Sequence, residues 1–261
     1  MHAKASARAY ADGTPSPLSR FSLLAPERGK SRHDQIAAIL GIELLQGRYQ
    51  SGGVMPVETA LMERFHVSRT VVREVMKTLG AKGFVAPSTR AGTRVRDTMY
   101  WSFFDSDVLA WRLRLGLDDE FKQTLDQIRR ALEPVAAALA AQRRRPQDIA
   151  LLRQCLRQIG RKNHSRQSFS AADRDFHVAI CSASGNPIIR SIASVIETAL
   201  TGSSASSAPA DDPAHREVGI DGYAAIVDAI ETGDAQRASQ GIRNVIDTPT
   251  GGGLSPPAKP I

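Results

Sequence analysis

The chain has 261 residues, of which 42% are hydrophobic and 5% aromatic, and it carries 34 Lys and Arg against 27 Asp and Glu. This length suggests two domains with separate cores, and the aliphatic composition favours helices. The net charge of +7 favours a polyanionic partner. No apolar run reaches membrane-spanning length and the first residues lack the apolar core of a signal peptide, so we expect a cytoplasmic protein with no membrane partner.

The two cysteines, Cys155 and Cys181, lie within apolar helical patterns. A single disulfide is formally available, but two cysteines in a chain of this length do not form the framework typical of secreted proteins. Free cysteines are commonly buried in protein cores. We therefore expect two reduced, buried thiols.

Composition divides the chain into two folded parts and two loose ends. A leader at 1–30 and a tail at 249–261 are rich in proline, glycine and small residues, and both are expected to be disordered. The segment 31–97 is expected to form a DNA-binding domain, and the segment 98–248 an all-helical domain. A soft stretch at 202–213 is expected to be a loop between helices.

The segment 31–97 has the element order of a winged helix-turn-helix. Ser31 and Asp34 form a capping box before an apolar helical stripe, and Gly47 can close that helix in the left-handed region. Two shorter helices and a small hairpin follow. The expected elements are helices near 31–47, 57–65 and 68–80, and a hairpin of 84–86 with 93–96.

The helix at 68–80 has two different faces. Its apolar residues recur at three- and four-residue spacing, which predicts a buried face. Basic residues recur every four residues on another face, where a helix in the major groove can pair Arg with guanine. A solvated amphipathic helix would show the same pattern, but the basic hairpin that follows favours DNA, and its glycine lets the backbone approach a duplex closely. The residues expected to contact DNA are Ser68, Arg69, Thr70, Arg73, Lys77, Arg90, Gly92 and Arg94.

The stretch MPVETALMERFHVSRTVVREVMKTLGAKGFVAPSTRAGTRV resembles the winged-helix reader of the GntR family of transcription regulators. The resemblance implies that the third helix faces DNA and that Gly92 lies at the wing tip. Two positions depart from the family pattern. Thr59 stands where the family commonly has a DNA-contacting Arg, and His66 stands at a turn position usually occupied by Gly. The first departure predicts an altered operator preference rather than lost binding.

From residue 105 onward the sequence is helical with almost no strand pattern. An apolar stripe runs along one long helix, in which Pro134 is expected to cause a kink. The domain is predicted to be an antiparallel bundle, so the fold class of the chain is mainly α with one small β-hairpin. The stripe consists of Leu117, Phe121, Leu125, Ile128, Leu132, Val135 and Leu139. Further helices are expected at 147–162, 168–184, 186–201, 216–232 and 234–247.

This second part is similar to the FadR-type C-terminal domain, or FCD domain, of the same family. It shares, in the family order, the segments WSFFDSDVLAW, IRRALEPVAAALAAQ, DRDFHVAICSASGNP and YAAIVDAIETGDAQRA. Trp101, Asp105, Asp107 and Trp111 of the first segment are similar to the branch that responds to sugar acids. The resemblance implies a domain that binds a small carboxylate and dimerises.

Asp173 and His177 are spaced i and i+4, so one helical face presents a carboxylate and an imidazole that can share a metal ion. In the family, two later histidines complete such a site, but here the aligned positions hold Tyr223 and Val245. Two protein ligands hold zinc or a similar ion poorly. We therefore expect no bound metal, with Asp173 and His177 as the ligands if an ion binds weakly.

The same side chains are expected to line an effector cavity. Arg129 aligns with a family arginine in that cavity and can clamp a carboxylate, but a salt bridge of Arg129 with Asp126 or Glu133 is an equally open alternative. Asn186 is expected to cap the helix that follows it rather than to support the site. The expected effector-binding residues are Arg129, Asp173, His177 and Tyr223.

The leading hypothesis is a transcription regulator of a metabolic operon, by the family's habit a repressor, that binds double-stranded operator DNA as a homodimer. A small carboxylate such as a sugar acid would control it. One alternative is a constitutive DNA-binding regulator whose C-terminal domain only dimerises. A remote alternative is a metal-dependent hydrolase, but the absent histidines and the lack of a nucleophile–base arrangement weigh against any enzyme.

Overall fold

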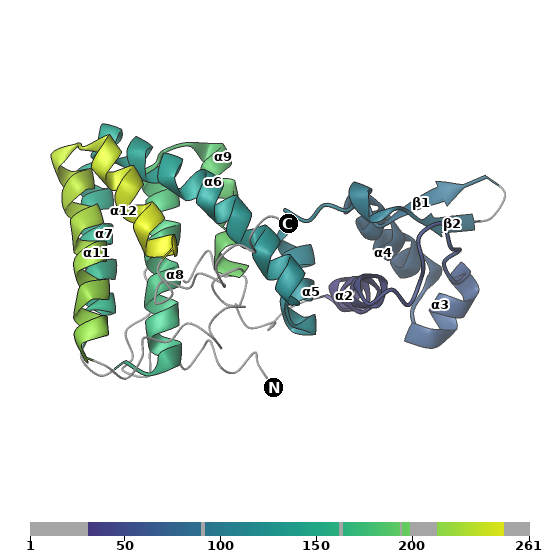
Figure 1. Ribbon diagram of the computed structural model, residues 1–261. Helices are drawn as coiled ribbons and strands as arrows, with labels where there is room; N and C mark the ends of the chain where they lie inside the picture. The colour runs from purple at the N-terminus through teal and green to yellow at the C-terminus, as the bar shows by residue number, and fades with distance from the viewer. Residues whose placement is uncertain (1–30, 90–91, 162–163, 194, 199–212, 248–261) are drawn as a thin grey trace, which may run out of the picture. The chain divides into compact units, whose positions relative to one another are not determined.

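The structure is a computed structural model that describes residues 31–89, 92–161, 164–193, 195–198 and 213–247 (Figure 1). The expected leader and tail, Arg90 and all but the last residue of the loop expected at 202–213 lie outside these residues; that last residue, Pro213, begins α11. The described part is helical apart from one hairpin, so the mainly α fold class is confirmed. No helix in this part is long and apolar enough to cross a membrane. The helices are α2 (Arg32–Leu45), α3 (Glu58–Phe65), α4 (Arg69–Ala81), α5 (Ser106–Leu115), α6 (Asp119–Arg143), α7 (Pro146–Ile159), α8 (Arg166–Ala183), α9 (Pro187–Ser191), α11 (Pro213–Thr232) and α12 (Ala235–Asp247).

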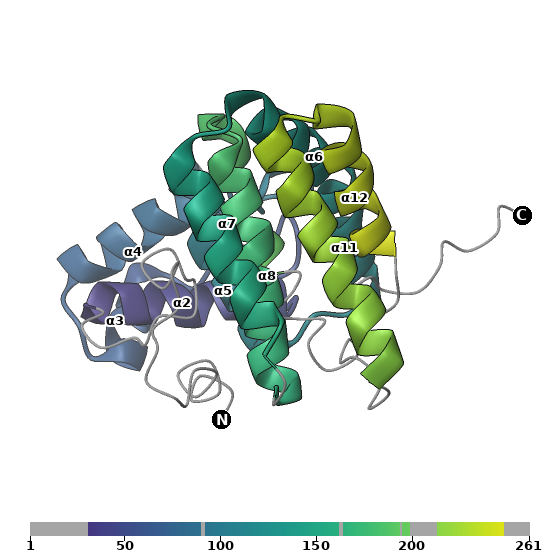
Figure 2. The same ribbon diagram turned by 90° about the vertical axis from the view of Figure 1, so that its left-hand side faces the viewer.

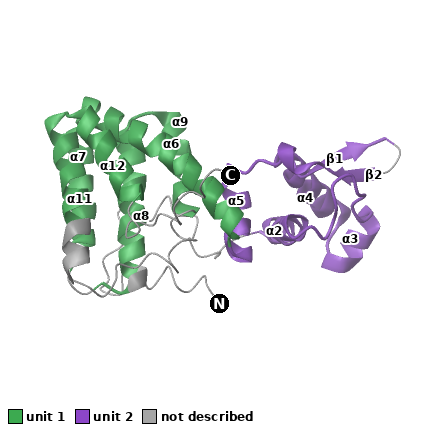
Figure 3. Ribbon diagram, in the orientation of Figure 1, with its two compact units in different colours: residues 1–25, 117–261 green, residues 26–116 purple. Residues whose placement is uncertain are grey.

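The first compact unit, within Pro26–Gly116, is a winged helix (Figure 3). Helices α2, α3 and α4 pack around one core, and the strands β1 (Val85–Ser88) and β2 (Gly92–Val95) pair antiparallel to form the wing. At the start of α2 the Ser31 hydroxyl accepts from Asp34 N, and the Asp34 carboxylate accepts from Ser31 N, so the capping box is confirmed.

The turn between α3 and α4 is built by two residues. His66 adopts the left-handed conformation (φ 52°, ψ 52°) and ends α3, which accommodates the departure from glycine at this position. Ser68 then caps α4, and its hydroxyl accepts from Val71 N. Helix α4 buries Val72, Val75 and Leu79 against the core. Its opposite face is therefore held toward solvent in a fixed orientation.

Helix α5 belongs to this first unit. We had expected it in the second, because the sequence suggested a boundary at residue 97. Trp111 of α5 is buried, and its ring centroid lies 6.0 Å from that of Phe84. Gly41 of α2 lies under the same ring, because a Cβ there would come within 2.2 Å of it. The boundary between the units therefore falls after Gly116 rather than at residue 97, since the large apolar side chains of α5 fill the winged-helix core.

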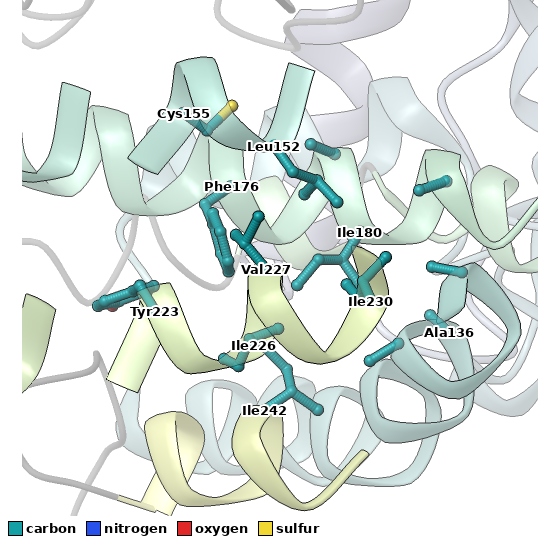
Figure 4. Close-up of a cluster of buried hydrophobic side chains, with 14 of the residues drawn as sticks. Ala136, Leu152, Cys155, Phe176, Ile180, Tyr223, Ile226, Val227, Ile230 and Ile242 are labelled. Carbon is teal, nitrogen blue, oxygen red and sulfur yellow. The ribbon is translucent and has the colours of Figure 1, made fainter. Parts of the chain in front are cut away.

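The second unit is a bundle in which α6, α7, α8, α11 and α12 lie side by side (Figures 1 and 2). Each helix contributes to one apolar core (Figure 4). Both cysteines, Cys155 and Cys181, are free and buried in this core, as expected. Helix α9 ends at Ser191, earlier than predicted, and residues 195–198 are helical again. The core includes Ala136 from α6, Leu152 from α7, Phe176 from α8, Ile230 from α11 and Ile242 from α12.

The buried face of α6 differs from the apolar stripe of its sequence. Alanines such as Ala136 and Ala140 and several charged residues face the interior of the bundle. Leu125 of the aliphatic stripe is buried with them, but Ile128 and Leu132 are half-buried and Val135 is 47% exposed. The small side chains allow neighbouring helices to approach α6 closely, and the described residues leave part of the aliphatic stripe uncovered.

Candidate functional site

Helix α4 presents a row of basic side chains to solvent. Arg69, Arg73 and Lys77 are 59%, 63% and 73% exposed, and they recur once per turn on the face opposite the core. Thr70 is exposed beside them in the first turn. Ser68 is exposed as well, but its hydroxyl already caps the helix, so its role in positioning α4 is independent of any ligand.

A carboxylate that the sequence did not single out lies beside this row. Glu58, the first residue of α3, accepts a hydrogen bond from Arg73 Nε at 3.0 Å through Oε1. Its other oxygen lies 3.6 Å from Arg69 Nε. One carboxylate thus restrains two arginines that would otherwise sample many rotamers. Only the fixed turn between α3 and α4 brings these residues together, and their separation in sequence gives no periodic pattern.

The wing contributes fewer described contacts. Gly92 opens β2 with φ 73°, and nothing lies within 4 Å of where its Cβ would be, so the backbone is open at this point. Arg94 is turned back on its own unit and donates from Nη1 to the carbonyl oxygen of Gly52. Arg90 lies outside the described residues, so its predicted contact with DNA stays a prediction.

The four predicted effector residues form one buried cluster inside the bundle. Helix α6 provides Arg129 and Glu133, α8 provides Asp173 and His177, and α11 provides Tyr223. Arg129 Nε donates to Glu133 Oε1 at 2.8 Å, and His177 Nδ1 is hydrogen-bonded to Glu133 Oε2. The Tyr223 hydroxyl donates to Asp173 Oδ1 at 2.6 Å. Glu133 is thus the centre of the cluster, joining two nitrogen-bearing side chains from different helices.

Two buried nitrogens of this cluster have no hydrogen-bond partner among the described residues, namely Arg129 Nη2 and His177 Nε2. The other two guanidinium nitrogens are engaged, since Nε binds Glu133 and Nη1 lies 3.5 Å from Asp126 Oδ1. His177 Nε2 lies 3.3 Å from Asp173 Oδ1, an ion-pair distance without the alignment of a hydrogen bond. The predicted salt bridges of Arg129 are therefore present, and they still leave one nitrogen open.

The cluster determines the charge of its members. Burial opposes protonation of His177, but the carboxylates of Glu133 and Asp173 outweigh it and raise the pKa of His177 to about 9. Burial also opposes ionisation of Glu133, yet the positive charges of His177 and Arg129 hold the pKa of Glu133 well below its ordinary value. Burial and the neighbouring Asp173 raise the pKa of Tyr223, so its phenol is a neutral donor. At neutral pH the cluster thus pairs two cations with carboxylates.

The residues that resembled the sugar-acid branch do not lie in this cluster. They belong to the winged-helix unit, where Trp101 and Trp111 pack on Phe84. Lys82, at the end of α4, binds Asp105 Oδ1 at 2.6 Å and Asp107 Oδ2 at 2.8 Å. The segment therefore fastens the start of α5 to the end of α4. Its aspartates could be found from sequence, but their partner could not.

One further prediction about the bundle, the helix cap at Asn186, is confirmed. Asn186 caps α9, because its Oδ1 accepts from Ile188 N and Ile189 N. Val245, aligned with a family histidine, is buried in the apolar core. Within the described ranges, no group of three or more His, Cys, Asp or Glu side chains is arranged to hold a metal ion.

Comparison with known proteins adds independent findings. The model of the family "Bacterial regulatory proteins, gntR family" matches residues 32–95, and that of the FCD domain matches residues 125–248. The Galactonate operon transcriptional repressor of Escherichia coli is 28% identical over 220 residues, covering 84% of this chain and 96% of its own. The uncharacterized HTH-type transcriptional regulator YieP of Escherichia coli is 33% identical over 242 residues, covering 89% and 99%.

One solved structure supports the fold alone. It is described as Lar, which controls the expression of the Listeria monocytogenes agr system. It aligns with a TM-score of 0.51 at 19% identity and covers 81% of this chain and 91% of its own.

Proposed function

Since the chain belongs to the GntR family of DNA-binding transcription regulators, we propose that it acts in the cytoplasm as the repressor of a metabolic operon. It binds operator DNA as a homodimer and releases it when a sugar acid binds in the FCD domain. Its matching families and relatives are regulators rather than enzymes, so the hydrolase alternative is set aside.

The observation that carries the proposal is the exposed basic face of α4, with Arg69 and Arg73 held by Glu58. The test is selection of operator sequences from a random DNA library, followed by fluorescence anisotropy with the selected site. Arg69→Ala and Arg73→Ala are each expected to weaken specific binding by roughly 5- to 150-fold, the equivalent of about 1–3 kcal/mol. Arg157→Ala, at an exposed arginine of α7, is the matched control. Unchanged binding by both α4 variants would place the DNA on another surface.

The class of effector is supported by the printed name of the galactonate operon repressor and by the buried cluster. Sugar acids such as galactonate and gluconate are expected to lower operator affinity, whereas galactose, which lacks the carboxylate, is expected to have no effect. If no acid changes operator affinity, the constitutive alternative is correct. Arg129 Nη2 and His177 Nε2 have no hydrogen-bond partner within the part of the chain that the structure describes. They argue against that alternative, because a domain that only dimerises has no need of them.

The homodimer is supported by the aliphatic stripe of α6, of which Val135 remains 47% exposed. A two-fold dimer presents two reading helices to two half-sites of a palindromic operator. Native mass spectrometry is expected to show a dimer, and Val135→Asp to shift it toward monomer. Ile188→Asp, at an exposed isoleucine of α9, is the control. A monomeric wild-type chain at the concentrations that bind operator would contradict the proposal.

A further inference from the structure

The side chains of the buried cluster do not fit a divalent metal ion. His177 and Asp173 are close enough to share one, with 3.3 Å between Nε2 and Oδ1. However, Oδ1 already accepts the Tyr223 hydroxyl at 2.6 Å, and this phenol is neutral and a poor ligand. A buried valine, Val245, offers no donor atom. The guanidinium of Arg129 adds a fixed positive charge to the same cluster, and Asp173 contributes to stabilising that charge.

The unsatisfied atoms of the cluster fit an anion instead. A guanidinium is always protonated and has only donors, so the open Nη2 of Arg129 can be satisfied only by an acceptor. Among the described residues, His177 Nε2 is the second buried nitrogen of the cluster without a hydrogen-bond partner, and it is 3.3 Å from Asp173 Oδ1. Both side chains bind the same carboxylate, Glu133, and are therefore neighbours across α6 and α8. Native proteins rarely leave such groups unpaired in a core, and no described residue supplies the acceptor, so we expect an oxygen atom of a bound ligand to be the partner.

We propose that the effector binds here without a metal ion, its carboxylate accepting from Arg129 Nη2 and His177 Nε2 and its 2-hydroxyl donating to Asp173. This inference rests on the effector-binding role proposed above. Because Glu133 and Asp126 occupy the other two guanidinium nitrogens, Arg129 binds the carboxylate through one nitrogen and not through the usual two-pronged fork. Tyr223 takes over the task of orienting Asp173, which an ion would otherwise perform.

Asp173 makes the site selective for 2-hydroxy acids. The negative charge of Asp173 repels the carboxylate of a simple acid. In a 2-hydroxy acid, the hydroxyl next to the ligand's carboxylate can donate a hydrogen bond to Asp173 and offset this repulsion. An ionised carboxylate has about four lone-pair positions, of which Tyr223 uses one. Aldonates are therefore expected to bind more tightly than carboxylates of similar size that lack the 2-hydroxyl, such as adipate.

The test is isothermal titration calorimetry of gluconate and galactonate into the full chain, once after EDTA treatment with metal content verified and once with added zinc. The two conditions are expected to give the same affinity. Arg129→Lys keeps a positive charge but has no Nη2, and is expected to bind at least about tenfold more weakly. Because Arg129 is buried, Arg129→Lys could also unfold the bundle, so Tyr223→Phe is a second variant. It is expected to weaken binding about threefold to tenfold. Circular dichroism checks that both variants are folded. Asp228→Asn, on the exposed side of α11, is the matched control.

The outcomes distinguish failure of metal-free recognition from failure of the proposed effector-binding function. Binding that needs zinc overturns metal-free recognition and leaves the proposed function intact. No acid binding in either condition, with operator binding preserved, overturns both this inference and the proposed effector class. Wild-type affinity in both Arg129→Lys and Tyr223→Phe places the acid elsewhere and overturns the site.

A separate experiment tests why the cluster does not fit a metal ion. The double variant Tyr223→His with Val245→His is expected to bind zinc in total metal analysis. If it binds none, our explanation of why the native side chains do not fit a metal ion is refuted.

Discussion

Replacing Glu133 with glutamine is expected to destabilise the bundle and to remove much of its sensitivity to alkaline pH. The Glu133 carboxylate binds Arg129 Nε at 2.8 Å and also binds His177 Nδ1, and all three side chains are fully buried. Glutamine keeps the shape of the side chain but leaves two buried cations without their shared counter-charge. Removing one partner of such a group costs about 3–5 kcal/mol.

The pH dependence follows from His177, whose pKa is raised from 6.5 to about 9 in the folded state. Because the folded state binds this proton more tightly than the unfolded state, the stabilisation is fully present below about pH 6.5. It declines as the pH rises and is lost above about pH 9, a total of about 3 kcal/mol at about 1.4 kcal/mol per pH unit. Without the carboxylate of Glu133 the pKa of His177 falls, and the slope of stability against pH flattens in this interval.

The assay is urea unfolding at about pH 6 and about pH 9.5, followed by far-ultraviolet circular dichroism and by tryptophan fluorescence. Both tryptophans of the chain, Trp101 and Trp111, lie in the winged-helix unit, so fluorescence reports that unit and serves as an internal control. Glu231→Gln is the matched variant, because this exposed carboxylate pairs with Arg153 at the surface, where such pairs contribute about 0–1 kcal/mol.

Two results would refute this reasoning. One is a Glu133→Gln protein that unfolds at the same urea concentration as Glu231→Gln. The other is a wild-type bundle whose stability does not fall between the two pH values, which would mean that His177 is not held protonated by its neighbours.

Three further predictions concern the winged-helix unit. Gly41→Ala places a Cβ 2.2 Å from the Trp111 ring and is expected to lower the free energy of unfolding by about 1–3 kcal/mol. Urea unfolding followed by fluorescence measures this change. The control Gly80→Ala, whose Cβ would lie 3.6 Å from its nearest atom, is expected to leave the free energy of unfolding unchanged. Glu58→Gln is expected to lower the ratio of operator affinity to random-DNA affinity by about threefold to tenfold, since Arg73 loses its restraint; an unchanged ratio in anisotropy would contradict this. Lys82→Met keeps the apolar stem but not the two hydrogen bonds, and is expected to destabilise the same fluorescence transition by about 1–3 kcal/mol; no shift would show that the link is dispensable.

The local features of the DNA-binding unit could be predicted from the sequence. The capping box of Ser31 and Asp34, the cap at Ser68 and the basic face of α4 all depend on groups three or four residues apart. The left-handed residue at His66 was expected from the resemblance to the GntR family, in which this turn position is usually occupied by Gly. These interactions are short-range, so the sequence alone contains both partners at a known spacing.

Only the tertiary structure showed which unit contains α5 and which face of α6 is buried. Trp111 and Val135 are both large apolar residues on helices, yet one is buried in the winged-helix core and the other is nearly half exposed. Helical spacing shows which residues share a face, but it does not show what covers that face. That choice depends on the shapes of elements far apart in the chain.

The same distinction applies to the two sites. The sequence by itself placed Asp173 and His177 on one helical face, and the family resemblance added Arg129 and Tyr223 as expected members of the same site. The structure brings these four side chains into one cluster, in which Glu133 joins Arg129 to His177. Only the tertiary structure showed that Glu133, already an expected salt-bridge partner of Arg129, also binds His177 on α8, and that two nitrogens remain without a hydrogen-bond partner among the described residues. The physical reason is that satisfying a buried polar atom depends on distances and angles between helices, which no spacing along one helix encodes.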